Sequence, residues 1–235
     1  TKKTKAIIPV DFAGHPAEME EIKAIALKHG LTIIEDAAHA LGAEYRGGRI
    51  GSCRYSDMTI LSFHPVKHIT TGEGGMILTN RRDFYDKLIM FRNHGITRDK
   101  ARLIDKNRPK WFYEMQFLGF NYRITDIQCA LGASQMDKLD KFVEKRREIA
   151  DFYKKEFKDV KEITFLHERH YAKSSWHIFP ISVNKKRDVM FDRLRAMGIG
   201  VNVQYIPIYL QPYYDRLGYR KNLCPKAEKY YNSTI

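Results

Sequence analysis

The chain has 235 residues, of which 43% are hydrophobic and 29% charged, and 41 Lys and Arg against 28 Asp and Glu give a formal net charge of +13. This composition is typical of a folded protein and argues against a disordered tail or a fibrous repeat. No apolar run reaches the roughly 18 residues of a membrane span. Three distant cysteines without a CxxC pair argue against disulfides or a zinc site, so we expect reduced thiols, no metal and a cytoplasmic protein.

The hydrophobic pattern at the start of the chain predicts a strand, a helix and a second strand. Apolar residues indicate a strand over 6–10, a helix over 16–29 that Gly30 ends, and a strand over 31–35. Two strands joined by a helix favour a parallel sheet covered by helices. Asp36 then stands at the carboxyl end of a strand, where open α/β sheets bind their ligands.

Later segments predict a larger and a smaller domain. In the larger domain we expect a turn at 45–49, strands at 58–63 and 75–79, a helix at 84–94, a long charged loop at 96–117 and a helix from a capping box at Thr125. A helix at 141–157 follows. The last third of the chain then predicts a strand at 178–183, a helix at 188–197 and a strand at 199–205. We place the boundary near 145–155, with residues 1–150 in the larger domain and 151–235 at the start of the smaller one.

Lys67 is the first candidate for chemistry. It lies in a turn rich in Gly and Thr that leaves a predicted buried strand, within SFHPVKHITTGEGG. A lysine amine held in a pocket loses its proton readily and attacks carbonyl groups. From spacing alone, a solvated loop lysine is the simpler interpretation, but Asp36 changes the balance. A lysine and a carboxylate at neighbouring strand ends are the two groups that a pyridoxal phosphate site needs.

Four motifs, EDAAHALGA (35–43), SFHPVK (62–67), GG (74–75) and GFNYR (119–123), resemble in order and spacing the nucleotide-sugar aminotransferases of the DegT/DnrJ/EryC1/StrS family. The resemblance covers essentially the whole chain. It implies an α/β fold of the pyridoxal-phosphate-dependent aminotransferase type I, similar to aspartate aminotransferase. The segment GVNVQYIPIY (200–209) is most similar to the branch that aminates UDP-linked 4-keto-6-deoxy-N-acetylhexosamines on the way to pseudaminic acid.

The resemblance implies roles for individual side chains. Lys67 forms the internal aldimine with pyridoxal 5′-phosphate, and Asp36 pairs with its pyridinium nitrogen. His39 approaches the cofactor ring or its 3-hydroxyl group. Ser62 reaches the cofactor phosphate or the substrate. Asn121 is offered to the cofactor and substrate of the neighbouring subunit, which makes a homodimer with shared active sites the expected assembly.

The substrate side of the implied site has four further members, which are His177, Asn202, Gln204 and Tyr205. The alternative interpretation is that His39 and His177 are satisfied core histidines and that Tyr205 only packs. The implied reaction moves an amino group from glutamate to the C4 keto group of the sugar through pyridoxamine phosphate. Because dehydratases of the family carry histidine in place of Lys67, this lysine favours a transaminase.

Other interpretations stay open at this point. We see no match to the family's N-terminal phosphate-binding turn, and we expect a fragment truncated at both ends that binds the cofactor weakly when isolated. Another 3- or 4-aminotransferase of the family, a non-catalytic scaffold and a basic nucleic-acid binder are the alternative functions. The last lacks a known binding signature, and its basic residues alternate with acidic ones, as in 144–148, so we expect no nucleic-acid partner. His64, His68 and Glu73 receive no role beyond shaping the turn around Lys67.

Overall fold

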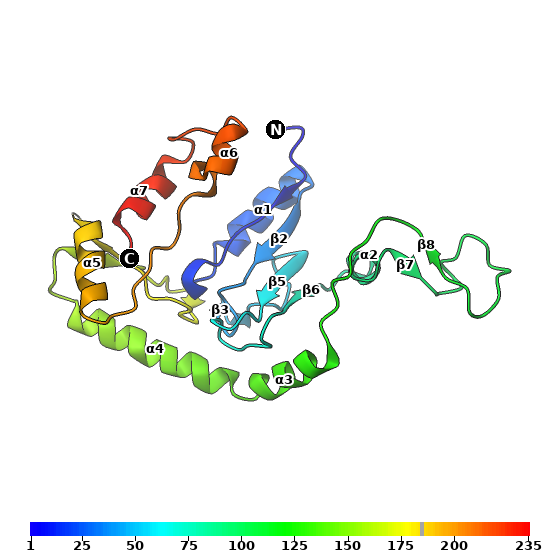
Figure 1. Ribbon diagram of the computed structural model, residues 1–235, viewed down its shortest axis with the longest axis horizontal. Helices are drawn as coiled ribbons and strands as arrows, with labels where there is room; N and C mark the ends of the chain where they lie inside the picture. Colours follow the sequence, from blue (N-terminus) through cyan, green and yellow to red (C-terminus); the bar gives the residue numbers. More distant parts are fainter. Residues whose placement is uncertain (184–185) are drawn as a thin grey trace. The chain divides into compact units, whose positions relative to one another are not determined.

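The structure is a computed structural model that describes residues 1–183 and 186–235 and divides into two compact units (Figure 1). The first unit comprises residues 1–144 and 170–177, and the second comprises the remaining described residues. The division falls inside the long helix α4 (Leu139–Glu156), between residues 144 and 145. Each unit is described by itself below.

A four-stranded sheet in the order β1-β2-β5-β6 is the centre of the first unit. Its elements are β1 (Ala6–Ile7), α1 (Met19–His29), β2 (Thr32–Asp36), β5 (Met58–Ser62) and β6 (Gly75–Leu78). The β1, β2 and β5 strands are parallel, which confirms the predicted fold class. The β6 strand runs antiparallel to β5, because residues 63–74 contain no helix that could carry the chain back across the sheet.

Two hydrophobic clusters hold this sheet. One packs α1 against the strands and contains Met19, Ala26, Ile33 and Tyr45. The other combines Leu61 of β5 with residues that follow the carboxyl ends of β2 and β5 and with the start of α4: Ala37, Ala40, Leu41, Ala43, Phe63, Ile69, Leu139 and Val143. The second cluster therefore fixes the loops at the carboxyl edge of the sheet.

Smaller elements complete the first unit. They are the 3₁₀ turn η1 (Phe12–Gly14), β3 (Glu44–Tyr45), β4 (Gly48–Arg49), α2 (Arg82–Arg92), β7 (Ile96–Thr97), β8 (Glu114–Met115), α3 (Asp126–Met136) and β10 (Ala172–Lys173). The segment expected to be a loop at 96–117 contains the antiparallel pair β7 and β8, which Figure 1 shows extending beyond α2, away from the sheet. The predicted capping box is confirmed, since Thr125 and Gln128 exchange side-chain and backbone hydrogen bonds.

The second unit contains an antiparallel pair of strands and short helices. Its elements are β9 (Ile163–Phe165), β11 (Ile181–Val183), α5 (Arg187–Ala196), the 3₁₀ turn η2 (Ile208–Leu210), α6 (Pro212–Arg216) and α7 (Pro225–Ser233). The strand predicted over 199–205 is wrong, because those residues form no strand. The backbone of Ile235 bonds to Ile181 instead, at 2.9 and 3.0 Å, so the position beside β11 belongs to the segment after α7.

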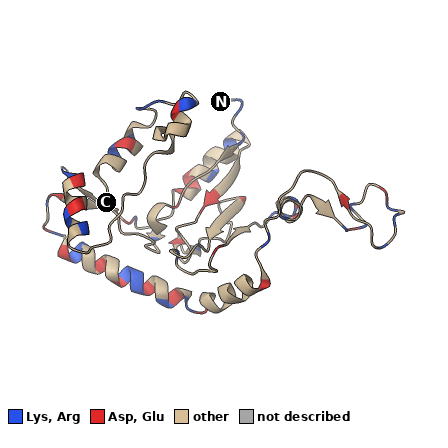
Figure 2. Cartoon of the chain, viewed as in Figure 1, with Lys and Arg blue, Asp and Glu red and all other residues tan. Residues whose placement is uncertain are grey.

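Charged residues of both signs alternate along α4 (Figure 2), as the sequence suggests for a solvated helix face. Within the described ranges, we find no helix that combines the length and the apolar character needed to cross a membrane. The basic residues of α4 are therefore interspersed with acidic ones and do not form a continuous basic stripe.

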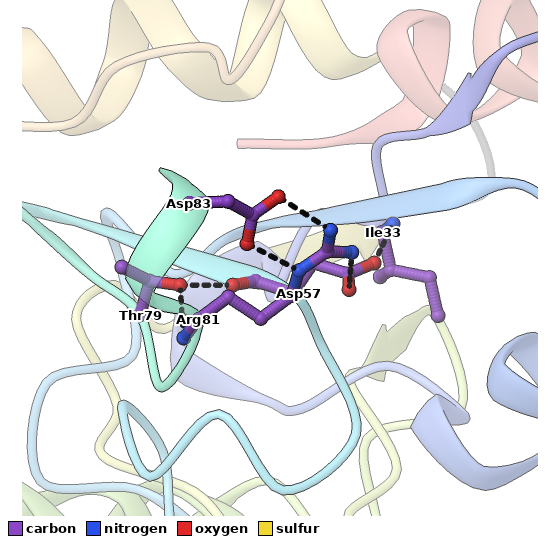
Figure 3. Close-up of polar contacts among 5 residues, drawn as sticks. All are labelled: Ile33, Asp57, Thr79, Arg81 and Asp83. Atoms are coloured by element: carbon purple, nitrogen blue, oxygen red, sulfur yellow. Dashed lines mark hydrogen bonds and ion pairs between the residues drawn. The ribbon is translucent and has the colours of Figure 1, made fainter. Parts of the chain in front are cut away.

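A polar network around Asp57 joins the amino ends of β2 and β5 to the end of β6 (Figure 3). The Asp57 carboxylate accepts the Ile33 N–H at 2.8 Å and the Arg81 guanidinium at 3.1 Å. Thr79 donates its hydroxyl to the Asp57 carbonyl at 2.7 Å. Arg81 also donates two bonds to Asp83, at 2.7 and 3.1 Å, and these bonds lower the pKa of the Asp83 carboxyl. The charges at this edge are paired and hold the strands in register.

Candidate active site

Asp36 is the last residue of β2, and its backbone is fixed by the neighbouring chain. Its N–H donates to the Pro9 carbonyl at 2.8 Å, and its carbonyl accepts the Asp11 N–H at 3.0 Å. The Asp36 carboxylate accepts the Ala38 N–H at 3.1 Å. The carboxylate is therefore held at the carboxyl edge of the sheet, opposite the Asp57 network.

Lys67 lies in the connection from β5 to β6, in a turn closed by its own N–H to the His64 carbonyl at 2.9 Å. Phe63 anchors this connection, since its N–H donates to the Gly74 carbonyl at 2.9 Å and its carbonyl accepts the Thr71 N–H at 3.0 Å. Gly74 has φ +154°, and a Cβ there would lie 2.4 Å from the Thr71 hydroxyl, so glycine is required. The two residues after Lys67 are only 4% and 2% exposed, which ties the turn to the core.

The surroundings of Lys67 and His39 disfavour the charged forms of both side chains. Burial lowers the pKa of Lys67, and the negative charge of Asp36 partly opposes that shift. Burial, with a smaller contribution from the charge of Lys67, lowers the pKa of His39 to about 4. An amine with a lowered pKa is a better nucleophile toward carbonyls at neutral pH. An amine of this kind beside a fixed carboxylate matches the groups that pyridoxal phosphate requires.

His39 and His177 pack together beside η1. The Ala13 N–H donates to His39 Nδ1 at 3.3 Å, so the neutral ring carries its proton on Nε2. The His177 ring lies 4.4 Å from the His39 ring, and the His177 N–H donates to the Ala13 carbonyl at 3.0 Å. His177 is buried and His39 half-buried. Both histidines are built into the structure at the edge where Asp36 and Lys67 lie.

Ser62 is the last residue of β5, and its hydroxyl accepts the His64 N–H at 3.4 Å. Because β2 and β5 are parallel neighbours, Ser62 and Asp36 end their strands at the same edge of the sheet. The first unit thus gathers five of the predicted site residues at one edge. These are Asp36, His39, Ser62, Lys67 and His177.

The other four predicted site residues belong to other parts of the chain. Asn121 is exposed, and its backbone pairs with Asn93 in the segment after β8. The remaining three, Asn202, Gln204 and Tyr205, belong to the second unit. The Asn202 side chain accepts the N–H of the next residue at 2.8 Å, and Tyr205 is 53% exposed. The roles predicted for these four residues stay predictions.

Two buried carboxyl groups behind this edge were not predicted from the sequence. Asp11 is fully buried and accepts the Ala17 N–H at 2.9 Å, just before α1. Glu35 accepts hydroxyl bonds from Thr59 at 2.6 Å and Ser56 at 2.9 Å. Burial, reinforced by the charge of Glu35, raises the pKa of Asp11 to about 8. For Asp11 the available signal was an acidic residue directly after the predicted strand over 6–10, the same signal that identified Asp36, whereas Glu35 lies inside β2.

Comparison with known proteins gives a consistent result. The model of the DegT/DnrJ/EryC1/StrS aminotransferase family matches residues 1–235. The chain is 43% identical over 216 residues to a Campylobacter jejuni protein named UDP-4-amino-4,6-dideoxy-N-acetyl-beta-L-altrosamine transaminase, which covers 90% of this chain and 54% of the relative.

Solved structures agree with the sequence relatives. The Helicobacter pylori aminotransferase PseC, described as involved in the biosynthesis of pseudoaminic acid, superposes with a TM-score of 0.89 at 35% identity and covers 100% of this chain and 61% of that chain. The PLP-form of Spr1654 from Streptococcus pneumoniae has a TM-score of 0.88 at 28% identity and covers 100% of this chain and 63% of its own. The chain therefore spans between about half and two thirds of the length of these proteins.

These matches confirm the predicted fold type I of pyridoxal-phosphate-dependent aminotransferases. They agree with the observed sheet, whose carboxyl edge carries Asp36 and Lys67. The chain belongs to the DegT/DnrJ/EryC1/StrS aminotransferase family, whose cofactor is pyridoxal 5′-phosphate.

Proposed function

We propose that the protein containing this chain is a transaminase that moves an amino group from glutamate to the C4 keto group of a UDP-linked 4-keto-6-deoxy-N-acetylhexosamine. The observation that carries this proposal is the presence of Lys67 and Asp36 at one edge of the sheet, with the pKa of Lys67 lowered by burial. The names of the C. jejuni relative and of PseC support the sugar class.

Asp36 and Lys67 would hold two different groups of the cofactor. The Asp36 carboxylate would keep the ring nitrogen protonated, and its bond from Ala38 leaves it little freedom to turn away. Lys67 would bind through its amine. When bound, pyridoxal phosphate supplies an electron sink for the charge that develops at the carbon losing its proton.

Lys67 also supplies the base for the proton transfers. Once glutamate has displaced it from the cofactor, the Lys67 amine, whose lowered pKa favours its neutral form, would take the proton from Cα of glutamate and pass it to C4′ of the cofactor. In the second half of the reaction it would take a proton back from C4′ and deliver it to the C4 carbon of the sugar. The same side chain therefore serves both halves of the transfer. An alanine at this position would lose the binding role and the proton-transfer role together, and a histidine would lose the binding role.

The neighbouring side chains would orient the bound molecules. Neutral His39 can donate its Nε2 proton to the 3-hydroxyl oxygen of the cofactor, because Nδ1 already accepts the Ala13 N–H. We assign the Ser62 hydroxyl to the cofactor phosphate or the substrate, and His177 to the substrate side. These groups hold and align the reactants and transfer no proton at carbon.

The remaining assignments concern the whole protein. We propose a homodimer in which Asn121 completes the site of the partner subunit. We also propose that Asn202, Gln204 and Tyr205 contact the sugar nucleotide. Cys53, Cys129 and Cys224 are all free thiols, which suits the reducing cytoplasm that we propose as the location.

The test uses the purified full-length protein and pyridoxal phosphate. We expect a visible absorbance band that shifts when glutamate is added and is absent in Lys67→Ala. A panel of UDP- and dTDP-linked 3-keto and 4-keto sugars, with the amination position read by NMR, then identifies the acceptor. Amination at C3 would show that the acceptor is a 3-keto sugar and that the protein is a 3-aminotransferase of the same family. A band that shifts with glutamate but supports no sugar amination by any member would contradict the proposed acceptor class, and a colourless protein would contradict the enzyme itself.

A further inference from the structure

His68, the residue after Lys67, is buried, and its side chain makes a hydrogen bond to a distant segment of the chain. It is 4% exposed, and its Nε2 lies 3.1 Å from the carbonyl oxygen of Ser175. Since a carbonyl oxygen only accepts hydrogen bonds, Nε2 carries a proton and donates it. This bond connects the Lys67 turn to a segment 107 residues later in the chain, within the same unit.

The acceptor of that bond is itself firmly held. The Ser175 N–H donates to the Gly14 carbonyl at 3.1 Å, and the Ser175 hydroxyl donates to the His39 carbonyl at 3.2 Å. Gly14 has φ +93°, and a Cβ at this position would lie 2.7 Å from the Ser175 hydroxyl and 2.9 Å from the His39 carbonyl. Such a close approach requires glycine and leaves the Ser175 backbone little room to move.

The rings of three histidines form a row across this junction. The His177 ring lies 5.6 Å from the His68 ring and 4.4 Å from the His39 ring. In the part of the chain that the structure describes, no three His, Cys, Asp or Glu side chains are arranged to hold a metal ion. The row contributes packing and hydrogen bonds, and it links the Lys67 turn to His39.

The Lys67 turn needs such an anchor because its other side is open. His64, Pro65 and Val66 are exposed, and they precede Lys67 directly. On the buried side, Ile69 packs into the hydrophobic cluster and fixes the depth of the turn. A hydrophobic contact of that kind is non-directional, whereas the His68 bond fixes the rotation of the backbone that carries Lys67.

We propose that His68 is a positioning residue, whose Nε2–H bond to the Ser175 carbonyl holds the Lys67 amine in its reactive orientation at the Asp36 edge. This inference rests on the proposed function of Lys67. It adds a residue to which the sequence assigned only a shaping role. The effect of losing the bond would be on alignment, where a displacement of about 1 Å can reduce a rate by about a hundredfold.

Two amide variants separate the hydrogen bond from packing. His68→Gln places an N–H donor near the position of Nε2, whereas His68→Asn has the same amide on a shorter side chain that does not reach Ser175. His68→Leu fills most of the volume without a donor. Because Asn and Gln share their chemistry, the comparison remains informative if the leucine variant does not fold.

The experiment measures the full-length protein, with two readouts. One is the pH midpoint at which Lys67 captures pyridoxal phosphate, followed by visible absorbance and assigned by borohydride trapping and peptide mapping. The other is the single-turnover rate with glutamate. Because burial lowers the pKa of Lys67, a loosened turn that admits water should raise this pKa, and His68→Asn should shift the midpoint to higher pH.

The expected pattern is that His68→Asn lowers the single-turnover rate about tenfold or more with an unchanged glutamate KM, while His68→Gln restores both the rate and the midpoint. Equal behaviour of the two variants, whether both normal or both impaired, would overturn the positioning role. A wild-type protein that captures no cofactor on Lys67 would overturn the proposed function, and the inference with it. A wild-type protein that captures cofactor while both variants match it overturns the inference alone.

Discussion

The two ends of the central sheet treat charge in opposite ways. At the amino ends of β2 and β5, Asp57, Arg81 and Asp83 are paired by hydrogen bonds, and the pKa of Asp83 is lowered by its partner, which stabilises its charged form. At the carboxyl end, burial lowers the pKa of Lys67 and of His39, which destabilises their charged forms. Paired charges at one end secure the fold, and desolvated groups at the other are available for chemistry.

The same strands connect the two ends. Ile33, bonded to Asp57, and Asp36, which faces the proposed cofactor site, are three residues apart on β2. The structural network thus holds in place the strand that carries the proposed partner of the ring nitrogen. This predicts that mutations at the amino end change stability, whereas mutations at the carboxyl end change activity and pH dependence.

The largest expected effect is on activity, at the carboxyl end. Asp36→Asn keeps an acceptor for the Ala38 N–H but loses the negative charge, so we expect the glutamate half-reaction to slow by at least about a hundredfold. Stopped-flow absorbance measures the rate, and circular dichroism checks the fold. Asp57→Asn is the matched control at the other end and should leave the rate unchanged. Equal losses in the two variants would break the comparison.

A large effect on pH dependence is expected at Asp11. Its pKa is raised to about 8 from 3.8, so the folded state keeps a proton that the unfolded chain loses above about pH 4. Its stabilising contribution is full below pH 4 and is lost as the pH rises toward 8. The free energy of unfolding of the wild type, relative to Asp11→Asn, should therefore fall by up to about 1.4 kcal/mol per pH unit in this range. Urea titrations at several pH values measure it, and parallel profiles would contradict a buried neutral Asp11.

A moderate effect on stability is expected at the amino end. Asp57→Ala removes the acceptor of the buried Ile33 N–H, which should lower the free energy of unfolding by about 1 to 3 kcal/mol. Asp57→Asn retains an acceptor oxygen and should lose less. Chemical denaturation measures both variants. If Asp57→Ala instead reduced amino transfer without loss of stability, the division between the two ends would be wrong.

An effect with the opposite sign to that of Asp11 is expected at His39. Burial lowers the pKa of His39 to about 4 from 6.5. Between these two pH values the imidazole therefore binds a proton in the unfolded chain but stays neutral in the folded state. The stability is present above pH 6.5 and is lost as the pH falls toward 4. His39→Asn keeps an acceptor for the Ala13 N–H, and its free energy of unfolding should fall less steeply between pH 6.5 and 4 than that of the wild type. An unchanged acid limb in urea titrations would show that His39 is not held neutral.

The sequence predicted the parts of the fold that depend on local pattern. The strand, helix and strand before Asp36 follow from periodicity, and the Thr125 capping box follows from two side chains three residues apart. The strand expected over 199–205 was wrong because a strand requires a pairing partner, and the place beside β11 is occupied by the segment that ends at Ile235. Pairing between distant segments is not visible in hydrophobic pattern.

The sequence also predicted the site residues that depend on local pattern or on family motifs. Asp36 and Lys67 stood out because their positions after apolar strands indicate the carboxyl edge, and the family motifs added His39 and Ser62. His68 could not be assigned, because its bond to Ser175 joins segments that only the fold brings together. The proton on Asp11 depends likewise on Glu35 and on complete burial, which are properties of the packed structure.

The central claim is that the Lys67 amine binds pyridoxal phosphate. The most direct measurement is borohydride reduction of the full-length protein loaded with pyridoxal phosphate, followed by proteolysis and mass spectrometry of the peptides. The account predicts that the pyridoxyl group is found on the peptide containing Lys67, and that Lys67→Ala carries none. A label on another lysine of the wild type, or no label at all, would contradict it.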